Sequence, residues 1–133
     1  RESHPKSPYA PRAALAAARL AVDQGNLEAA RAELQWAVDN TREEGLRETA
    51  RLRLARVLLA QQRHDEALAA LGGPVSAPFR ALVADLRGDV LLAQNKPDAA
   101  RAAYQEALDA SGPESQYRTL VELKRDAIPG GKR

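Results

Sequence analysis

Few residues of this 133-residue chain belong to types that could do catalytic chemistry, and their spacing forms no recognisable site. There is no cysteine, which excludes disulfides, thiolate zinc sites and cysteine nucleophiles. The two histidines are His4, near the start of the chain, and His64, between two expected helices. No serine or carboxylate constellation surrounds either of them. We therefore expect that the protein is not an enzyme.

Two other patterns could in principle bind a ligand, and both are weak. Asp85 and Asp89 are four residues apart on one expected helix face, but no histidine is near them in sequence, so an ion-paired or solvated face is expected instead of a metal site. Gly72 and Gly73 precede Pro74 and lack the lysine of a phosphate-binding loop. The sequence predicts no metal and no cofactor.

A basic helix could suggest nucleic-acid binding, but the charge pattern argues against it. The basic residues in question are Arg47, Arg51, Arg53, Arg56 and Arg63. They spread over more than one helix face and follow several glutamates, and the whole chain has 20 basic against 18 acidic residues. An ordinary solvated helix is the better interpretation, and we expect no nucleic-acid partner.

The composition indicates an all-α fold. The chain contains 28 alanines and 18 leucines, which favour helices, and few β-branched residues. No apolar run approaches the roughly 18 residues that a membrane-spanning helix needs. The sequence opens with Arg1 and a polar, proline-containing stretch, so we expect that the natural protein continues upstream.

Glycine and proline punctuate the expected helices. The predicted helices run from Pro11 to Gly25, from 27 to about 42, from 46 to about 62, from 65 to 71, from after Pro78 to 95 and from 97 to before Gly112, with Gly45 breaking the second from the third. A last amphipathic helix is expected within 113–127, whose Tyr117, Leu120, Val121 and Leu123 would cover the preceding helices. Residues 1–8 and 128–133 are predicted to be disordered.

Three segments align without gaps and reveal an internal repeat. They are AARLAVDQGNLEAARAEL from Ala17, LARVLLAQQRHDEALAAL from Leu54 and RGDVLLAQNKPDAARAAY from Arg87. The small residues Ala18, Ala55 and Gly88 are each followed twelve positions later by an alanine, at residues 30, 67 and 100. Those alanines are 37 and 33 residues apart, which brackets the 34-residue period of the tetratricopeptide repeat.

Close helix packing explains the small residues. A glycine inside a helix costs about 1 kcal/mol relative to alanine, so Gly88 is expected to allow a close contact with its partner helix. The sequence therefore predicts a short tetratricopeptide-repeat-like α-solenoid of about three helix pairs, with repeats at about 11–44, 45–77 and 78–111 within a domain 9–127.

The sequence resembles the ancillary SecYEG translocon subunit family, also called YfgM-like. The resemblance lies in LRLARVLLAQQRHDEALAAL (52–71) and ALVADLRGDVLLAQNKPDAARAAYQEAL (81–108), with YAPRAALAAARLAVDQGNLEAARAELQWAV (9–38) compatible with it. Membership would imply a single-span inner-membrane protein that carries this domain in the periplasm. It would also imply partners, namely the SecYEG translocon and a PpiD-type periplasmic chaperone, and a role in passing emerging clients to chaperones.

Repeat geometry predicts where a protein partner binds. The first helix of each tetratricopeptide pair lines a concave groove, and the residues expected there are Leu15, Arg19, Val22, Leu52, Arg56, Leu59, Leu82, Asp85, Asp89 and Leu92. This set combines an apolar seam with mixed charge, which suits an apolar segment of a partner or client. We also expect Arg56 to face Asp89 across the groove, with simple solvation of both as the alternative.

A second interpretation of function remains open at this level. The same fold could belong to a soluble tetratricopeptide adaptor of an unrelated pathway that binds a peptide segment in the same groove. The coding sequence upstream of Arg1 distinguishes the two, because only a tethered protein needs an apolar stretch of roughly 20 residues there.

Overall fold

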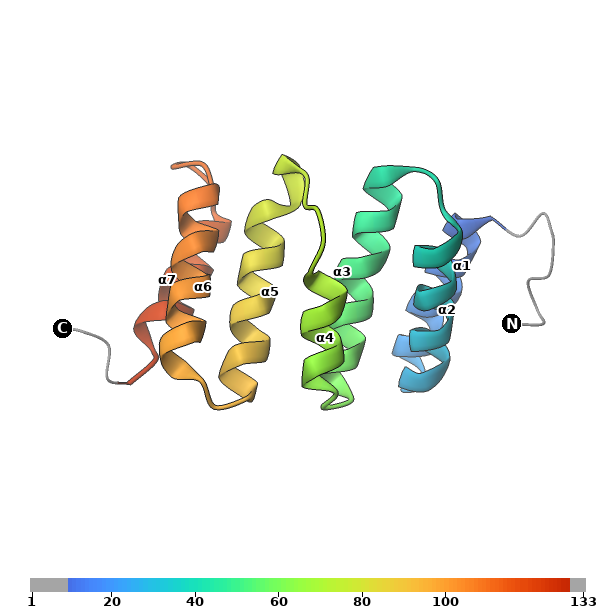
Figure 1. Ribbon diagram of the computed structural model, residues 1–133, viewed down its shortest axis with the longest axis horizontal. Coiled ribbons are helices and arrows are strands. Elements are labelled where there is room, and N and C mark those ends of the chain that lie inside the picture. Colours follow the sequence, from blue (N-terminus) through green and yellow to red (C-terminus); the bar gives the residue numbers. More distant parts are fainter. Residues whose placement is uncertain (1–9, 130–133) are drawn as a thin grey trace. The chain divides into compact units, whose positions relative to one another are not determined.

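The chain consists of α-helices joined by short connections. A computed structural model describes residues 10–129, and no strand occurs within that range (Figure 1). The helices are α1 (Pro11–Asp23), α2 (Leu27–Asn40), α3 (Glu44–Ala60), α4 (His64–Leu71), the 3-10 turn η1 (Ala77–Phe79), α5 (Arg80–Ala93), α6 (Pro97–Ala110) and α7 (Tyr117–Asp126). The predicted all-α class is confirmed. The expectations of disorder at 1–8 and 130–133 lie outside the described residues.

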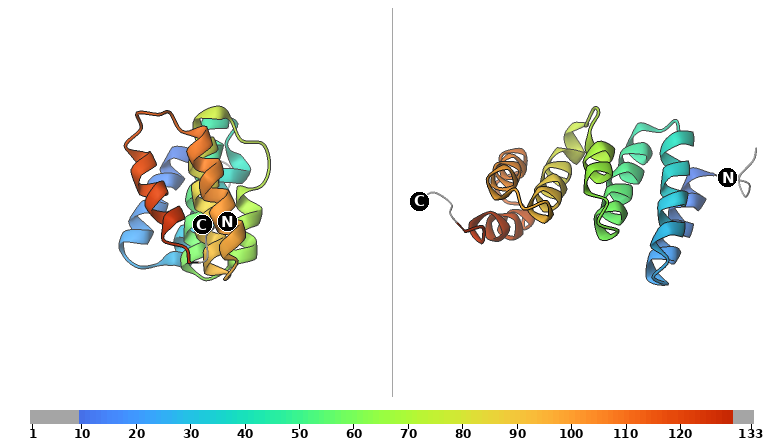
Figure 2. Two further views of the ribbon diagram at one scale, coloured as in Figure 1. Left: turned by 90° about the vertical axis from the view of Figure 1, so that its left-hand side faces the viewer. Right: turned by 60° about the horizontal axis from the view of Figure 1, so that its bottom comes forward.

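The chain divides into two compact units, residues 1–70 (unit 1) and residues 71–133 (unit 2). In unit 1, α1 packs on α2 and α2 packs on α3. In unit 2, α5 packs on α6 and α6 packs on α7, and both views of Figure 2 show α7 beside α6. Each unit therefore has its own helix-on-helix core.

The turns inside the helix pairs are built alike. Gly25, Gln62 and Asn95 adopt φ angles of 77°, 63° and 63°. The amide after each of them donates to a carbonyl five residues earlier, in the bonds Asn26 to Ala21 (2.8 Å), Arg63 to Leu58 (2.8 Å) and Lys96 to Leu91 (2.9 Å). This is the Schellman arrangement, which satisfies carbonyls at a helix end. The spacing of these turns matches the predicted repeat, although two of them lack the expected glycine.

The break between α2 and α3 lies earlier than the sequence suggested. Gly45 was expected to break these helices, but α3 begins at Glu44 and Gly45 sits in its first turn. The chain instead leaves the helix at Thr41, which is extended and only 3% exposed. The Arg47 guanidinium donates to the Thr41 carbonyl at 2.6 Å, so the group that ends α2 is satisfied by the next helix.

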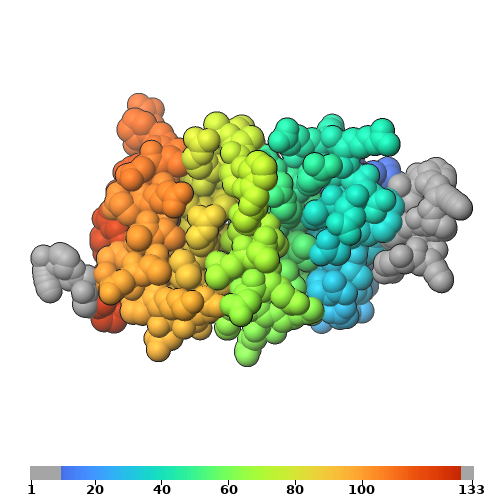
Figure 3. All heavy atoms as spheres, in the orientation of Figure 1, coloured from blue at the N-terminus to red at the C-terminus, as the bar shows by residue number. Residues whose placement is uncertain are grey.

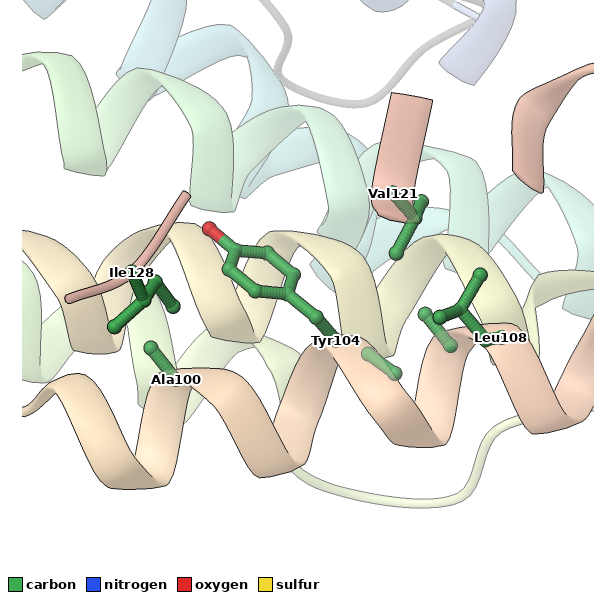
Figure 4. Packing of buried hydrophobic residues seen from close by; sticks show 7 residues of the cluster. Ala100, Tyr104, Leu108, Val121 and Ile128 are labelled. Atoms are coloured by element: carbon green, nitrogen blue, oxygen red, sulfur yellow. The ribbon is translucent and has the colours of Figure 1, made fainter. Parts of the chain in front are cut away.

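A large aromatic residue against a glycine forms the core of unit 2. The Tyr104 side chain is 1% exposed and lies among Ala100, Leu108, Val121 and Ile128 (Figure 4). A Cβ atom built on Gly88 would lie 2.4 Å from Tyr104 Cε1, closer than real contacts allow. Gly88 is therefore required for the close packing of α5 on α6, as its place in the repeat predicted. The atoms of these two helices meet along the face turned to the viewer in Figure 3.

The helix α7 packs on α6 through fewer residues than expected. Val121 is fully buried, whereas Leu120 is 51% and Leu123 is 64% exposed, so the expectation that both leucines cover the core is wrong. Ile128, which the sequence assigned to a disordered tail, is 5% exposed in the core, and the Pro129 carbonyl accepts a hydrogen bond from Arg101. The packed chain therefore extends two residues beyond the expected boundary at 127.

Candidate protein-interaction surfaces

An open groove lies within unit 1, between α1 and α3, with α2 beneath them. It has a volume of about 350 Å³, and we call it the α1–α3 groove. The residues that line it are Ala18, Arg19, Val22, Asp23, Leu27, Leu34, Arg53, Arg56, Val57 and Ala60. The fold thus brings together three of the predicted groove residues, Arg19, Val22 and Arg56.

Among the described residues of unit 1, the charged side chains of the α1–α3 groove have no partner. Arg19, Arg53 and Arg56 are exposed, and none of them makes a hydrogen bond or ion pair with a described residue of unit 1. Asp23 is the single carboxylate among the lining residues, and it makes no ion pair within the described part of this unit. The groove therefore combines an apolar floor with an excess of uncompensated positive charge.

In unit 2 the helix that corresponds to α3 is α5, and its carboxylates do have partners in their own unit. Lys124 of α7 lies 3.0 Å from an Asp85 oxygen and 3.2 Å from an Asp89 oxygen on α5. The Tyr117 hydroxyl donates to Asp85 at 2.6 Å, and the Tyr104 hydroxyl donates to Asp89 at 2.7 Å. Both carboxylates are thus held by groups of their own unit.

This cluster shifts the pKa of the half-buried Lys124 and of the buried Tyr104. Burial by itself lowers the pKa of Lys124, but the hydrogen bond to Asp85 and the charges of Asp89 and Asp85 outweigh it, so the Lys124 pKa is raised. Burial and the hydrogen bond to Asp89 raise the pKa of Tyr104. The cluster is therefore most stable with a charged lysine and a neutral tyrosine.

The predicted groove residues differ in how accessible they are. Leu15, Leu52 and Asp85 are each 8% exposed, so these three belong to buried structure and not to an accessible surface. Val22 and Leu92 are 44% and 42% exposed. Arg19 and Arg56 are exposed as well, while Leu59, Leu82 and Asp89 are half-buried. The expected pairing of Arg56 with Asp89 joins residues of different units and stays a prediction.

Two side chains of these surfaces, Arg53 and Lys124, were not predicted from the sequence. Arg53 was grouped with solvated basic residues, although it precedes Arg56 by three positions and so shares a helix face with it. Lys124 lies seven residues after Tyr117, which places both on one face of α7. That spacing was the available signal that α7 carries a polar face toward α5.

No site for a metal ion and no membrane-crossing segment emerges from the described residues. Within residues 10–129, no three His, Asp or Glu side chains gather where they could hold a metal ion. None of the helices in that range combines the length and the hydropathy that a bilayer crossing needs.

The repeated helix pairs and turns agree with a known family. A family model described as "Tetratricopeptide repeat-like domain" matches residues 1–130. The chain belongs to this tetratricopeptide repeat-like family. The matched range takes in both units, so the family assignment applies to the whole described chain.

Similar proteins carry one common name. The ancillary SecYEG translocon subunit of Neisseria gonorrhoeae is 36% identical over 127 residues, which make up 96% of this chain and 61% of that protein. The subunit of the same name from Escherichia coli is 38% identical over 100 residues, or 75% of this chain and 48% of that protein. The resemblance stated from the sequence is confirmed. This tetratricopeptide repeat-like chain spans about half to three fifths of the length of these curated relatives.

Proposed function

We propose that this chain is a non-catalytic protein-interaction module of a membrane-associated protein that works with the Sec translocon. The observation that carries the proposal is the open α1–α3 groove, whose apolar floor and uncompensated arginines are suited to a peptide segment. The relatives named as ancillary SecYEG translocon subunits support the choice of partner. No catalytic role is assigned to any residue.

The proposal extends to the arrangement of the whole protein. One membrane-spanning helix precedes this domain, the domain lies in the periplasm, and the protein helps transfer emerging clients to a PpiD-type periplasmic chaperone. The support for this arrangement is the resemblance to the translocon subunits. The coding sequence upstream of Arg1 tests it directly. A single apolar stretch of roughly 20 residues with Lys or Arg on its N-terminal side supports the tether. A start codon within a few residues of Arg1 would support the soluble adaptor instead.

Site-specific photo-crosslinking tests the interaction in cells of the source organism. We would place p-benzoylphenylalanine at Val22, which is 44% exposed in the groove, and as a matched control at Leu123, which is 64% exposed on α7. The proposal expects translocon subunits in the Val22 adducts at a clearly higher yield than in the Leu123 adducts. Equal yields would show that the translocon does not bind at the groove in particular. The absence of translocon adducts from both positions would contradict the Sec association.

A further inference from the structure

Unit 1 contains a second groove of similar size, and its charges are arranged differently. This α2–α4 groove has a volume of about 380 Å³ and is lined by Arg31, Gln35, Val38, Arg51, Leu54, Leu58, Arg63, Glu66, Ala69 and Ala70. Arg31 forms a hydrogen-bonded ion pair with Glu28, and Arg63 forms one with Glu66. The hydrogen bonds from Arg31 and Gln61 lower the pKa of Glu28 to about 2. The chain thus neutralises Arg31 and Arg63 of this groove.

The α1–α3 groove lacks such neutralisation, and this difference points to an external partner. Arg53 and Arg56 lie one helical turn apart on α3, and Arg19 faces the same groove from α1. A guanidinium binds a carboxylate through two parallel hydrogen bonds, and the bond gains strength where apolar surface excludes water. The accessible apolar side chains of Val22, Leu27 and Ala60 supply that surface, above the buried Val57 and Leu34.

We propose that the α1–α3 groove binds a short acidic and apolar segment of a partner protein. Apolar side chains of the segment lie on Val22 and Leu27, and its carboxylates bind the three arginines. This inference rests on the proposed function, since it assumes that the groove is the binding surface, and it adds the chemistry of the partner.

Charge argues against the terminal residues of this chain as the occupant and favours a segment of another protein. The two terminal segments of this chain are themselves basic, because residues 1–9 carry Arg1 and Lys6 against Glu2, and residues 130–133 carry Lys132 and Arg133. Neither segment complements a groove with three arginines and one aspartate. An acidic segment does, and electrostatic complementarity of this kind selects partners and speeds their association.

Fluorescence anisotropy with designed peptides tests the inference on the full chain. The probe is a fluorescein-labelled peptide in which two leucines one helical turn apart are flanked by glutamates. One twin carries lysines in place of the glutamates, and another carries serines in place of the leucines. We expect binding of the first peptide alone, weakened by added salt. Equal binding of the lysine twin or of the serine twin would overturn the proposal.

Paired variants locate the binding in the groove. Arg19→Gln with Arg56→Gln removes two charges from the groove, and Arg42→Gln with Arg80→Gln removes two exposed charges elsewhere. We expect the groove variant to raise the dissociation constant about tenfold or more and the control variant to leave it within about twofold. The fluorescence of Trp36, the single tryptophan and a residue of unit 1, checks that both variants remain folded. Equal weakening by both variants would reduce the effect to general attraction and overturn the proposal.

Two further measurements distinguish a peptide from other occupants of the groove. The crosslinks then distinguish a failure of this inference from a failure of the proposed function. If the chain bound vesicles of anionic lipid more tightly than the peptide, and the groove variant weakened that binding as well, the occupant of the groove would be a membrane surface and not a peptide. If the chain dimerised with increasing concentration and the groove variant abolished the dimer, the occupant of the groove would be a second copy of this chain. Translocon crosslinks at Val22 without peptide binding would contradict this inference alone. Peptide binding without translocon crosslinks at Val22 or Leu123 would support this inference and contradict the Sec association.

Discussion

Arg56 in unit 1 and Asp89 in unit 2 occupy the same position of their repeats, yet their surroundings differ. Arg56 is exposed beside an open groove, and no described residue of its unit pairs with it. Asp89 accepts hydrogen bonds from Lys124 and Tyr104. The difference is that α7 follows the helix pair of unit 2 and supplies a cation to its face. The position of a residue in its repeat therefore indicates which face of the helix it lies on. The neighbouring helix decides whether its side chain is free to bind a partner.

Removal of α7 is expected to produce the largest effect, because it exposes the side chains of α5 and α6 that α7 covers in unit 2. A chain ending at Gly112 loses the burial of Val121 and Ile128, two apolar side chains worth about 1.5–3 kcal/mol each, so unit 2 should lose about 3–6 kcal/mol of stability. Hydrogen exchange followed by mass spectrometry would report faster exchange in α5 and α6. Unchanged exchange in those two helices would show that α7 is not part of this core.

Gly88→Ala tests the close packing of α5 on α6 in unit 2. The added methyl group would overlap the Tyr104 ring, which is 1% exposed and enclosed by its neighbours. Overpacking of this kind costs about 1–3 kcal/mol, against which the better helix propensity of alanine returns about 1 kcal/mol. Denaturant unfolding should show a net loss of stability. The same substitution at exposed Gly45, where a Cβ has no neighbour, is the matched control and should show no loss.

Lys124→Met and Arg56→Met compare a paired with an unpaired cation directly. The first change leaves Asp85 and Asp89, with side chains 11% and 26% exposed, without their cation, and we expect a loss of about 1–3 kcal/mol. The second removes a charge with no partner in its unit, so its effect should stay within about 0.5 kcal/mol. Thermal melts followed by circular dichroism measure both. Similar losses in the two variants would contradict the difference between the units.

The most gradual effect is expected at alkaline pH and confined to unit 2. The folded-state pKa of Tyr104 is raised above its ordinary value of 10.0, and that of Lys124 above 10.5. The stability that these groups contribute is fully present below those ordinary values and is lost as pH rises above them, by at most about 1.4 kcal/mol per pH unit for each group. Tyrosine absorbance should show that at least one tyrosine ionises only as unit 2 unfolds. Ionisation of all three tyrosines near pH 10 would contradict this expectation.

The elements that the sequence predicted correctly depend on local interactions. Three of them are Pro11 at the start of α1, the short α4 and the turn after each first helix, and all rest on interactions within about one helical turn. Gly88 was predicted for a different reason: its contact is with Tyr104 of another helix, but a glycine inside a helix has few explanations other than close packing. These features agree with the tetratricopeptide repeat-like fold.

Only the tertiary structure decided which of the predicted groove residues remain accessible. Lys124 reaches Asp85 and Asp89 from 39 and 35 residues away, a distance over which helical periodicity carries no information. Leu15 and Leu52 fit a groove by repeat position but are buried, whereas Arg53 proved to line the groove with Arg56. Burial and ion pairing depend on which helices pack together, and that arrangement arises only when the chain has folded.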